Sequence, residues 1–343
     1  MAVASRGTSL RTGVSARDVA EAAGVSRAAV SRAFTPGASI APQTRAKVMK
    51  VADALGYQVN SLARGLIRAE SGIVALIAAE LATPYRSALL AALTERLQEA
   101  GKVAMVINTD RSDVSVERAL RQAIGYRTEA AVFLSGMPAV SLAETCLRNR
   151  MQLVLINRDE ERPGSVRIRL DDNAAGRTAF GALVAAGCLR PALATSKAGT
   201  PSLAGREQGF REAAREAGFA VIEEAVGMTS YETGLDLGTR LMSRAERPDG
   251  VFCTTDLIAL GVMDAARHRF GVAVPRDLSV IGFDDVPQAA WESYLLTTFA
   301  QPVEAIADAC VDWLATSKPA TPEASLVTLP ASLIWRGSVR GRG

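Results

Sequence analysis

The sequence has little histidine and few aromatic residues, and this scarcity limits the chemistry that it can support. One histidine occurs in 343 residues, and aromatic residues make up 5% of the chain. That histidine, His268, stands between Arg267 and Arg269 near an expected helix end, where positive charge is favourable. We therefore expect no histidine-based active site. We also predict no catalytic residues and no cofactor.

Cysteine is also sparse, and it is not arranged for metal or redox chemistry. The four cysteines are far apart and form no C-x-x-C pair. They are Cys146, Cys188, Cys253 and Cys310. Free cysteine is usually buried as a small apolar residue. We expect the same of all four, and we predict no bound metal.

Long hydrophobic runs are absent. A membrane-spanning helix needs roughly 20 consecutive apolar residues, whereas the longest apolar runs, such as residues 73–79, have the length of a strand. Residues 1–14 lack the apolar stretch and cleavage site of a secretory signal. The sequence therefore predicts a cytoplasmic protein without membrane contact.

Positive charge is concentrated at one end of the chain. The first 70 residues hold ten arginines and lysines against four acids, a net charge of +6, whereas the remaining 273 residues carry a net charge of −3. A basic head on a mildly acidic body is expected when only the head meets a polyanion. A simple solvated basic face is the alternative.

The basic segment carries the signals of a helix-turn-helix. Ser15 and Asp18 have the spacing of a capping box, which predicts a helix start. Gly24 can adopt the left-handed conformation that ends this helix, and Ser26 can cap a second helix over residues 27–34. Two short helices joined by a turn with glycine form a helix-turn-helix.

A third helix is expected to support this pair. Pro42 opens it, and its apolar positions are expected to pack beneath the first two helices. Those positions are Ala46, Val48, Met49, Ala52 and Leu55. We predict a DNA-binding domain over residues 15–59, preceded by a flexible tail over residues 1–14.

The second helix has a face suited to the DNA major groove. Arg27, Ala28, Ser31 and Arg32 line one side of it. Arg32 or Arg27 could bind guanine O6 and N7, and Ser31 suits a phosphate. A surface arginine is more often simply solvated, so this interpretation depends on the whole motif.

These segments resemble the DNA-binding head of the lactose-repressor (LacI/GalR) family. The similarity is carried by Arg17-Asp18-Val19-Ala20-Glu21-Ala22-Ala23-Gly24-Val25-Ser26, Val30-Ser31-Arg32, Leu55-Gly56-Tyr57 and Asn60-Ser61-Leu62-Ala63-Arg64-Gly65-Leu66. The resemblance implies a hinge helix and linker over residues 60–70, with Leu66 inserted in the minor groove. The predicted DNA contacts are Ser15, Ser26, Arg27, Ala28, Ser31, Arg32, Asn60, Ala63 and Leu66.

The hinge segment is too short to be a stable helix by itself. Residues 60–66 include Gly65, and seven residues cannot hold a helix alone in water. We expect this segment to be disordered away from DNA. Two such segments, paired across a dimer, could fold together on DNA and kink it.

The rest of the chain alternates short apolar runs with longer helical stretches. The candidate strands are residues 73–78, 103–107, 131–134, 153–156, 192–194, 251–253, 278–281 and 297–299. The candidate helices between them are residues 87–99, 116–124, 173–186, 206–217 and 257–269. Such alternation predicts parallel α/β sheets, which bind ligands beyond the carboxyl ends of their strands.

This body resembles the two-lobed, periplasmic-binding-protein-like core of the same family. The matching segments are residues 155–158, 172–176, 206–210, 255–261, 279–285 and 296–298. The resemblance implies an effector-binding and dimerisation core over residues 71–338, followed by a tail over residues 339–343. It places the first lobe at about residues 71–168 and 301–325, and the second at about residues 169–300 and 326–338.

The resemblance also implies an effector pocket between the lobes. The matching positions are Tyr85, Ser135, Asn157, Ser202, Arg206, Thr255 and Asp284. Their hydroxyl, amide, guanidinium and carboxylate groups suit a ligand rich in hydroxyl groups, and the tyrosine offers a ring for stacking. A sugar or sugar derivative is expected. Thr255 and Thr229 replace the asparagine and the aromatic residue that are frequent in the family.

Several of these polar residues also have structural interpretations. Asp172 and Asp285 each follow another aspartate and are expected to cap a helix or a turn instead of binding ligand. Arg206 could be held by a neighbouring acid. The pocket assignment therefore rests on the set of residues as a whole.

Two other classes of protein share parts of this pattern. An enzyme on a nucleotide-binding fold would share the α/β body, but G-x-G-x-x-G after the first strand, G-x-x-x-x-G-K-[ST] and G-x-S-x-G are absent. An exported solute-binding protein would share the two lobes, but a helix-turn-helix has no use outside the cell. Neither class fits both halves of the chain.

The sequence therefore predicts a regulator of transcription with an all-α helix-turn-helix head, a hinge and a two-lobed α/β core. We expect a homodimer that binds double-stranded operator DNA as a repressor. The end of the chain has no leucine heptad for a tetramer. We expect the effector to release DNA, with a corepressor arrangement as the alternative.

Overall fold

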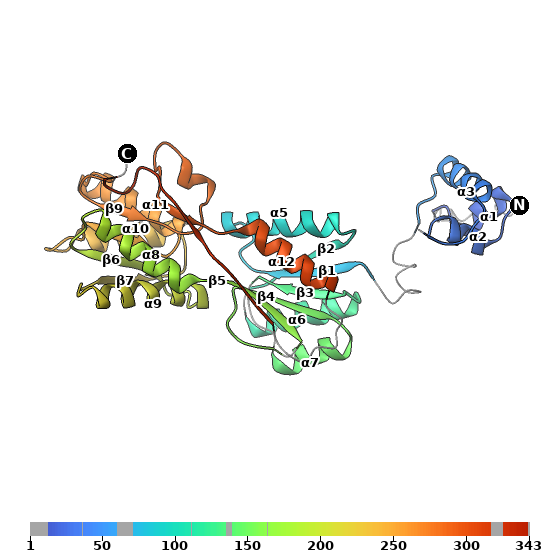
Figure 1. Ribbon diagram of the computed structural model, residues 1–343, viewed down its shortest axis with the longest axis horizontal. Coiled ribbons are helices and arrows are strands. Elements are labelled where there is room, and N and C mark those ends of the chain that lie inside the picture. Colours follow the sequence, from blue (N-terminus) through green and yellow to red (C-terminus); the bar gives the residue numbers. More distant parts are fainter. Residues whose placement is uncertain are drawn as a thin grey trace, which may run out of the picture. The chain divides into compact units, whose positions relative to one another are not determined.

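The computed structural model describes residues 13–35, 37–59, 71–110, 112–134, 139–162, 164–316 and 325–341. These residues fall into a small unit that ends at Ser71 and a large unit that begins at Gly72 (Figure 1).

In the part of the small unit that the structure describes, three helices pack together: α1 (Ala16–Ala23), α2 (Arg27–Ala33) and α3 (Pro42–Leu55). α1 begins at a reciprocal capping box between Ser15 and Asp18, and it ends at Gly24, whose φ of 62° lies in the left-handed region. Ser26 caps α2 because its Oγ accepts from the Ala29 amide at 3.2 Å. The predicted helix-turn-helix is confirmed.

The apolar side of α3 is narrower than the sequence indicated. Val48 and Ala52 are fully buried. Ala46, Met49 and Leu55, which were expected to join them, are exposed, Met49 by 37% and Leu55 by 39%. Successive helical residues turn by about 100°, so positions 48 and 52 share one face while positions 46 and 49 point elsewhere. α1 and α2 cover only that one face, and Leu55, although it lies on the same face, is exposed at the carboxyl end of α3.

The first lobe of the large unit is a parallel sheet in the order β11-β5-β4-β3-β1-β2. Its strands are β1 (Ile73–Ala78), β2 (Val103–Asn108), β3 (Ala130–Phe133), β4 (Gln152–Ile156), β5 (Ser165–Leu170) and β11 (Ser325–Leu329). The helices that cover it are α5 (Pro84–Glu99), α6 (Asp113–Gly125), α7 (Val140–Arg148) and α12 (Val303–Thr316). α5 and α12 pack with Leu76 and Val154, and α6 and α7 pack with Ile77 and Leu153 on the other face (Figure 1). The inner strands β1, β3, β4 and β5 are thus buried on both faces, whereas the edge strands β2 and β11 are partly exposed.

The second lobe has a smaller parallel sheet in the order β7-β6-β8-β9. Its strands are β6 (Pro191–Ser196), β7 (Ile222–Val226), β8 (Gly250–Cys253) and β9 (Ser279–Ile281). Its helices are α8 (Asp172–Ala185), α9 (Pro201–Glu216), α10 (Tyr231–Met242) and α11 (Asp256–Asp264), with the short η1 (Ala265–Arg269) after α11. α8 and α9 pack with Leu193 and Phe252, whereas α10 and α11 pack with Ala192 and Val251. The predicted fold class is confirmed.

The chain passes between the two sheets three times: after β5, after β10 (Thr298–Ala300), and again before β12 (Ser332–Ile334). β10 and β12 pair in antiparallel fashion. β5 remains in the first sheet as far as Leu170, and β11 beside it as far as Leu329. The first and last crossings therefore lie a few residues later than the positions 168 and 325 that the sequence indicated.

The C-terminal segment packs on the second lobe, so the tail expected over residues 339–343 is wrong where the chain is described. The Val280 amide donates to the Ser338 carbonyl at 2.8 Å. Val339 is only 2% exposed, and the Arg340 amide donates to Ser279 Oγ at 3.2 Å. Of the tail expected at the other end, only residues 13 and 14 are described.

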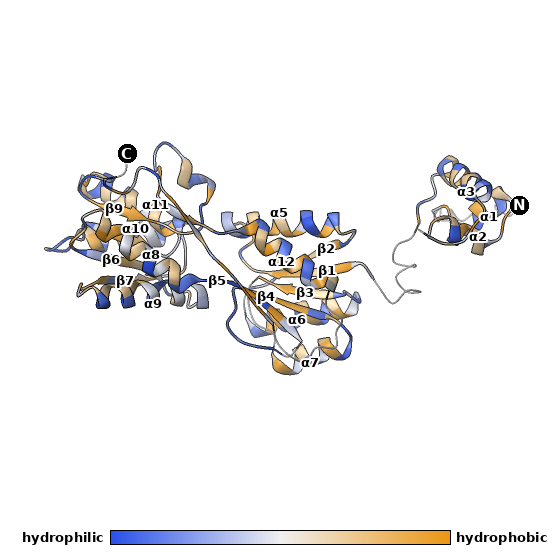
Figure 2. Ribbon diagram, viewed as in Figure 1, coloured by the Kyte–Doolittle hydropathy of each residue, from blue (hydrophilic) through white to orange (hydrophobic). Residues whose placement is uncertain are grey.

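The apolar residues of the large unit lie mainly in its strands and on the helix faces that cover them (Figure 2). All four cysteines are buried and free, which confirms the packing role expected of them. Among the described residues, no helix is long and apolar enough to cross a membrane. In that same part of the chain, no group of three histidine, cysteine or acidic side chains could hold a metal ion.

Candidate functional site

The exposed side of α2 is the first candidate site. Arg27, Ala28, Ser31 and Arg32 are all exposed on this helix. Arg32 Nε donates to the Ala28 carbonyl at 3.3 Å, which holds the side chain along the helix. These residues form one accessible side of a capped helix, and reading of base edges by them stays a prediction.

The other predicted DNA contacts are placed less directly. Ser15 and Ser26 are the N-caps of α1 and α2, and both are exposed at helix starts. Asn60, Ala63 and Leu66 lie outside the described residues. The interpretation of the hinge therefore rests on its sequence.

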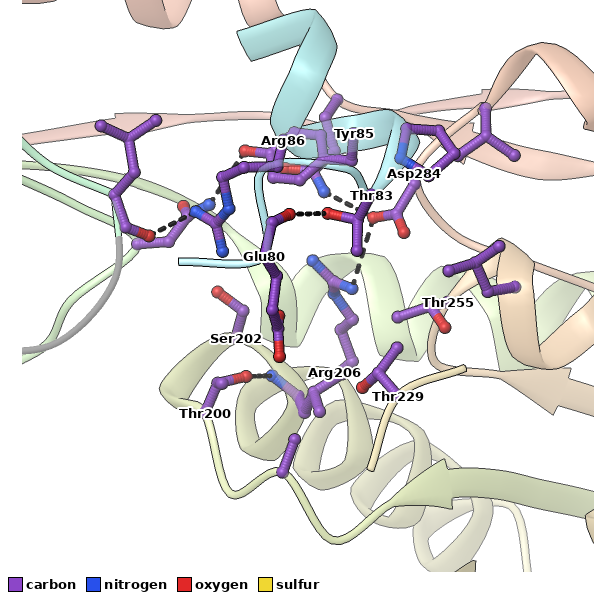
Figure 3. A pocket seen from close by; sticks show the side chains of 18 of the residues that line it. Glu80, Thr83, Tyr85, Arg86, Thr200, Ser202, Arg206, Thr229, Thr255 and Asp284 are labelled. Atoms are coloured by element: carbon purple, nitrogen blue, oxygen red, sulfur yellow. Dashed lines mark hydrogen bonds and ion pairs between the residues drawn. The ribbon is translucent and has the colours of Figure 1, made fainter. Parts of the chain in front are cut away.

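The second candidate site is a pocket between the two lobes of the large unit, with about 820 Å³ of empty space including its mouth (Figure 3). The predicted residues that line it are Tyr85, Asn157, Ser202, Arg206, Thr255 and Asp284. Ser135 lies outside the described residues. Side chains far apart in sequence thus meet at one cavity, as expected at the carboxyl ends of parallel strands.

Each lobe contributes through its strand ends and helix starts. Tyr85 lies in the first turn of α5, and Asn157 directly follows β4. Arg206 lies on α9, Thr255 caps α11 directly after β8, and Asp284 follows β9. Both lobes therefore contribute polar groups to one pocket.

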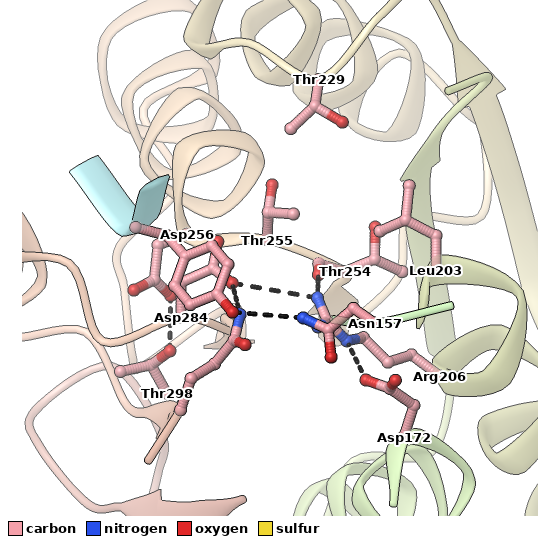
Figure 4. Close-up of polar contacts among 12 residues, drawn as sticks. Asn157, Asp172, Leu203, Arg206, Thr229, Thr254, Thr255, Asp256, Asp284 and Thr298 are labelled. Atoms are coloured by element: carbon pink, nitrogen blue, oxygen red, sulfur yellow. Dashed lines mark hydrogen bonds and ion pairs between the residues drawn. The ribbon is translucent and has the colours of Figure 1, made fainter. Parts of the chain in front are cut away.

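Arg206 is a buried side chain of the pocket that several protein groups hold in place. It is 3% exposed, its Nε donates to Asp172 Oδ1 at 2.8 Å, and its Nη1 donates to the Thr254 carbonyl at 2.8 Å (Figure 4). Asp284 Oδ1 lies 3.9 Å from the same Nη1, and the guanidinium lies 3.4 Å from the centre of the Phe283 ring. One face of this guanidinium is therefore fixed by protein groups.

This arrangement corrects the interpretation of the aspartate pair at the start of α8. The cap is Asp171, whose Oδ1 accepts from the Ala174 amide at 3.0 Å. Asp172, which was expected to cap, is instead 8% exposed and bound to Arg206. Burial raises the pKa of Asp172, and the charge of Arg206 opposes that shift.

Two glycines make this contact possible by letting α8 and α9 approach closely. A Cβ on Gly176 would lie 2.1 Å from the Arg206 carbonyl oxygen, and a Cβ on Gly209 would lie 2.0 Å from the Asn173 carbonyl oxygen. Both distances are far below van der Waals contact. The backbone of Arg206 thus lies directly against α8.

Asp284 and Gln301 form the floor of the pocket beside Arg206. Gln301 Nε2 donates to Asp284 Oδ1 at 2.6 Å. Burial raises the pKa of Asp284 above its usual range, whereas Arg206 lowers it. Gln301 is 7% exposed, and its buried Oε1 has no hydrogen-bond partner among the described residues. A ligand hydroxyl could donate to that oxygen.

Tyr85 and Asn157 line the pocket as a hydrogen-bonded pair. Asn157 Nδ2 donates to the Tyr85 hydroxyl oxygen at 3.1 Å. Burial raises the pKa of Tyr85 to about 12, so the phenol keeps its proton at neutral pH. Asn157 Oδ1 is buried and has no partner within the described chain. Together the two residues offer a donor and an acceptor to a ligand.

Two threonines in the pocket already have structural partners. Thr255 is the N-cap of α11, with Oγ1 accepting from the Ile258 amide at 3.5 Å. Thr229 shares a hydrogen bond with Ser196 at 2.7 Å.

The second aspartate of the Asp284–Asp285 pair has a different role from the one expected. Asp285, expected to cap a turn, forms an ion pair with Arg336 at 2.7 Å. That interpretation of Asp285 is wrong.

The sequence did not single out several of the residues that line the pocket. They are Glu80, Thr83, Arg86, Arg158, Thr200 and Gln301. Their common signal is position, since most directly follow a predicted strand or begin a helix. The carboxyl ends of the strands were predicted to bind ligand. The sequence therefore indicated the region of these residues without identifying each of them.

A buried carboxylate behind the pocket gives a prediction about pH. Asp256 is fully buried, and it accepts hydrogen bonds from Thr298 Oγ1 at 2.5 Å and from the Val286 amide at 2.9 Å. Burial raises the pKa of Asp256, and the nearby charge of Asp284 raises it further. A carboxyl pKa that is higher in the folded protein stabilises the fold at low pH, and this contribution is lost as pH rises above about 4.

We therefore expect Asp256→Asn to flatten the decline of the melting temperature between about pH 5 and pH 8, since an amide cannot ionise. Thermal unfolding across this range measures the effect. Asp236→Asn, at a half-exposed residue paired with Arg240, is the matched control. Equal pH profiles for wild type and Asp256→Asn would show that Asp256 does not titrate in this range.

Comparison with known proteins extends over both units. Residues 15–60 match the family described as bacterial regulatory proteins, lacI family, and residues 180–339 match a periplasmic binding protein-like domain. The transcriptional regulator DegA of Bacillus subtilis is 30% identical, with the similarity covering 84% of this chain and 86% of DegA.

Solved structures agree in fold. A lac repressor dimer bound to operator and the anti-inducer ONPF superimposes with a TM-score of 0.86, at 24% identity, over 96% of this chain and all of that one. A CelR–cellobiose complex gives a TM-score of 0.68 at 26% identity, over 95% of this chain and 99% of CelR. Both units of the chain thus have counterparts in one kind of protein.

Proposed function

The chain belongs to the LacI/GalR family of bacterial transcriptional regulators, and on that premise we propose that it is a cytoplasmic repressor whose operator affinity is controlled by a small polar effector. It is a DNA-binding regulator and not an enzyme. The observation that supports effector control best is the convergence of polar side chains from both lobes on one pocket.

We infer that the protein binds a roughly palindromic operator as a homodimer. One small head contacts too few base edges for useful specificity, and two heads double that number. The body is expected to supply the dimer contact, because the hinge alone cannot hold the heads at a fixed spacing. Leu66 of each hinge is expected to enter the minor groove between the two half-sites.

A sugar or sugar derivative is the proposed effector. Asp284, Asn157 and Gln301 offer acceptors and Arg206 offers donors, which is the mixture that a polyhydroxylated ligand needs. The related CelR was solved with cellobiose. We propose that the ligand changes lobe closure, weakens pairing of the hinges and so releases the operator.

A substitution in α2 tests the DNA-reading surface. We expect Arg32→Ala to weaken operator binding by about 1–3 kcal/mol, because a bidentate contact to guanine would be lost, with a much smaller effect on random DNA. Fluorescence anisotropy at one fixed salt concentration measures both. Lys50→Ala, at an exposed position of α3, is the control. Equal weakening on operator and random DNA would contradict a base-reading role.

Selection of DNA from a random library tests the proposed function. The full chain is expected to enrich one two-fold symmetric sequence, whereas a chain that lacks residues 1–70 is expected to enrich none. Retention on heparin at low salt should be lost with the same deletion. Enrichment by the body without its head would contradict the assignment of DNA binding to the head.

A further inference from the structure

Two arginines converge at one point of the pocket wall in the first lobe. Arg86 Nη1 donates to the Leu134 carbonyl, and Arg158 Nη2 donates to the same oxygen at 3.5 Å. Both residues line the pocket and are half-buried. The two positive charges therefore lie within a few ångströms of each other beside the ligand space, where screening by water is reduced.

The helix that carries Arg86 adds to this positive potential. Arg86 lies in the first turn of α5, a helix of 16 residues whose first turn has no acidic residue. The amino end of a helix favours anions, and a cation there is unfavourable. Burial raises the pKa of Asp284 and of Tyr85, and Arg86 is among the charges that lower both, so its field reaches the pocket floor. This wall is electrostatically suited to an anion.

The second lobe does not add a comparable excess of charge. Arg206 is already compensated by Asp172 at 2.8 Å and Asp284 at 3.9 Å. Among the described lining residues, the remaining acid is Glu80, which is exposed and belongs to the first lobe. The first-lobe wall is thus the part of the pocket where two arginines, Arg86 and Arg158, lie together.

Two buried acceptor oxygens, on Gln301 and Asn157, indicate that the same ligand carries hydroxyl groups. Gln301 is 93% buried, and its Oε1 has no partner within the described chain although it lines the cavity. Asn157 Oδ1 is also buried and has no hydrogen-bond partner among the described residues. Both oxygens accept hydrogen bonds, and unsatisfied buried acceptors are costly unless a ligand or water donates to them.

We propose that the effector is a polyhydroxylated compound with an oxyanion, either a carboxylate or a phosphate. The oxyanion binds Arg86 and Arg158, and the hydroxyls bind Gln301, Asn157 and Asp284. Arginine suits this role because its planar N–H groups bind carboxylate and phosphate in pairs. This inference rests on the proposed effector-controlled function and narrows its ligand to sugar acids or sugar phosphates.

Calorimetric titration of the full-length protein with inorganic phosphate tests the oxyanion site. We expect phosphate to bind about ten-fold more weakly to Arg86→Gln and to Arg158→Gln than to wild type, because charge-assisted hydrogen bonds are lost. Arg96→Gln is the matched control, since it removes the same charge from α5 at a residue paired with Asp308 outside the pocket. Any binding of phosphate to the basic head is the same in wild type and in these variants, so it does not affect the comparison of their affinities.

An unchanged melting temperature without ligand shows that each variant is folded, and Arg86→Lys is expected to give an intermediate affinity because it keeps only the charge. Equal phosphate affinity in wild type, Arg86→Gln and Arg158→Gln overturns the proposal.

A second set of titrations distinguishes the two oxyanions. D-glucose 6-phosphate and D-gluconate are compared with D-glucose, and preference for either anion over the neutral sugar identifies a phosphate or a carboxylate ligand. Binding of D-glucose that equals both anions and is unaffected by Arg86→Gln overturns the proposal but leaves effector control intact. Failure of the proposed function is seen separately, as loss of specific operator binding by the wild-type protein.

Discussion

We expect Arg206→Met to lower the free energy of unfolding of the body by about 3–5 kcal/mol, since it removes one partner of a buried ion pair. Asp172 is 8% exposed and would lose its hydrogen bond from Arg206 Nε, and Asp284 would lose its nearest cation. The loss of unfolding free energy should be smallest at low pH and grow as pH rises, because protonation of Asp172 and Asp284 at low pH removes their uncompensated charge. Urea unfolding at several pH values measures it.

The effect of the uncompensated carboxylate on stability can be separated from the effect of lost side-chain packing. Arg240→Met is the control, because Arg240 is about half exposed and its ion pair with Asp236 is a surface pair worth at most about 1 kcal/mol. Addition of Asp172→Asn to Arg206→Met should restore part of the stability, because the uncompensated carboxylate is then gone. A loss for Arg206→Met no larger than that for Arg240→Met would show that the buried network adds little to stability.

We expect Asp284→Ala to abolish the response of operator binding to the effector while operator affinity itself is unchanged. Asp284 accepts from Gln301 and lies 3.9 Å from Arg206, so its loss removes an acceptor for a ligand hydroxyl at the pocket floor. Typical couplings between two sites are about 1–3 kcal/mol, or roughly 5- to 150-fold in affinity. The wild type should show such a change, and the variant none.

The backbone at this position requires a companion variant. Asp284 has a φ of 127°, a conformation that side chains other than glycine rarely adopt. Asp284→Asn keeps the shape and most hydrogen bonding but removes the charge, so it should reduce the response without disturbing the fold. If Asp284→Ala is folded and responds to the ligand like the parent protein, the effector pocket has been assigned to the wrong place.

The sequence predicted the features that depend on a few neighbouring residues. The caps at Ser15 and Ser26 and the turn at Gly24 could be predicted because capping is decided within three or four positions. The strands with continuous apolar side chains, such as β1 and β8, were predicted for a similar reason. β5 and β7 were missed because arginines and glutamates interrupt their pattern.

Contacts across the fold could not be predicted in the same way. Asp171 and Asp172 are chemically identical, and which of them meets Arg206 depends on the close packing of α8 and α9 at Gly176. Gln301 reaches Asp284 because a parallel bridge joins Asp284 to the preceding residue of β10, and no local pattern marks that pairing. The pocket set was instead carried over from a family resemblance, and the structure brings six of its seven members together.

The most direct test of effector control is the affinity of the full-length protein for its selected operator, measured by fluorescence anisotropy at fixed salt with and without a compound that binds the pocket. Such a compound should weaken operator binding about 5- to 150-fold and leave binding to random DNA unchanged. A compound that binds between Arg206 and Tyr85 but leaves operator affinity unaltered would contradict the claim that this pocket controls DNA binding.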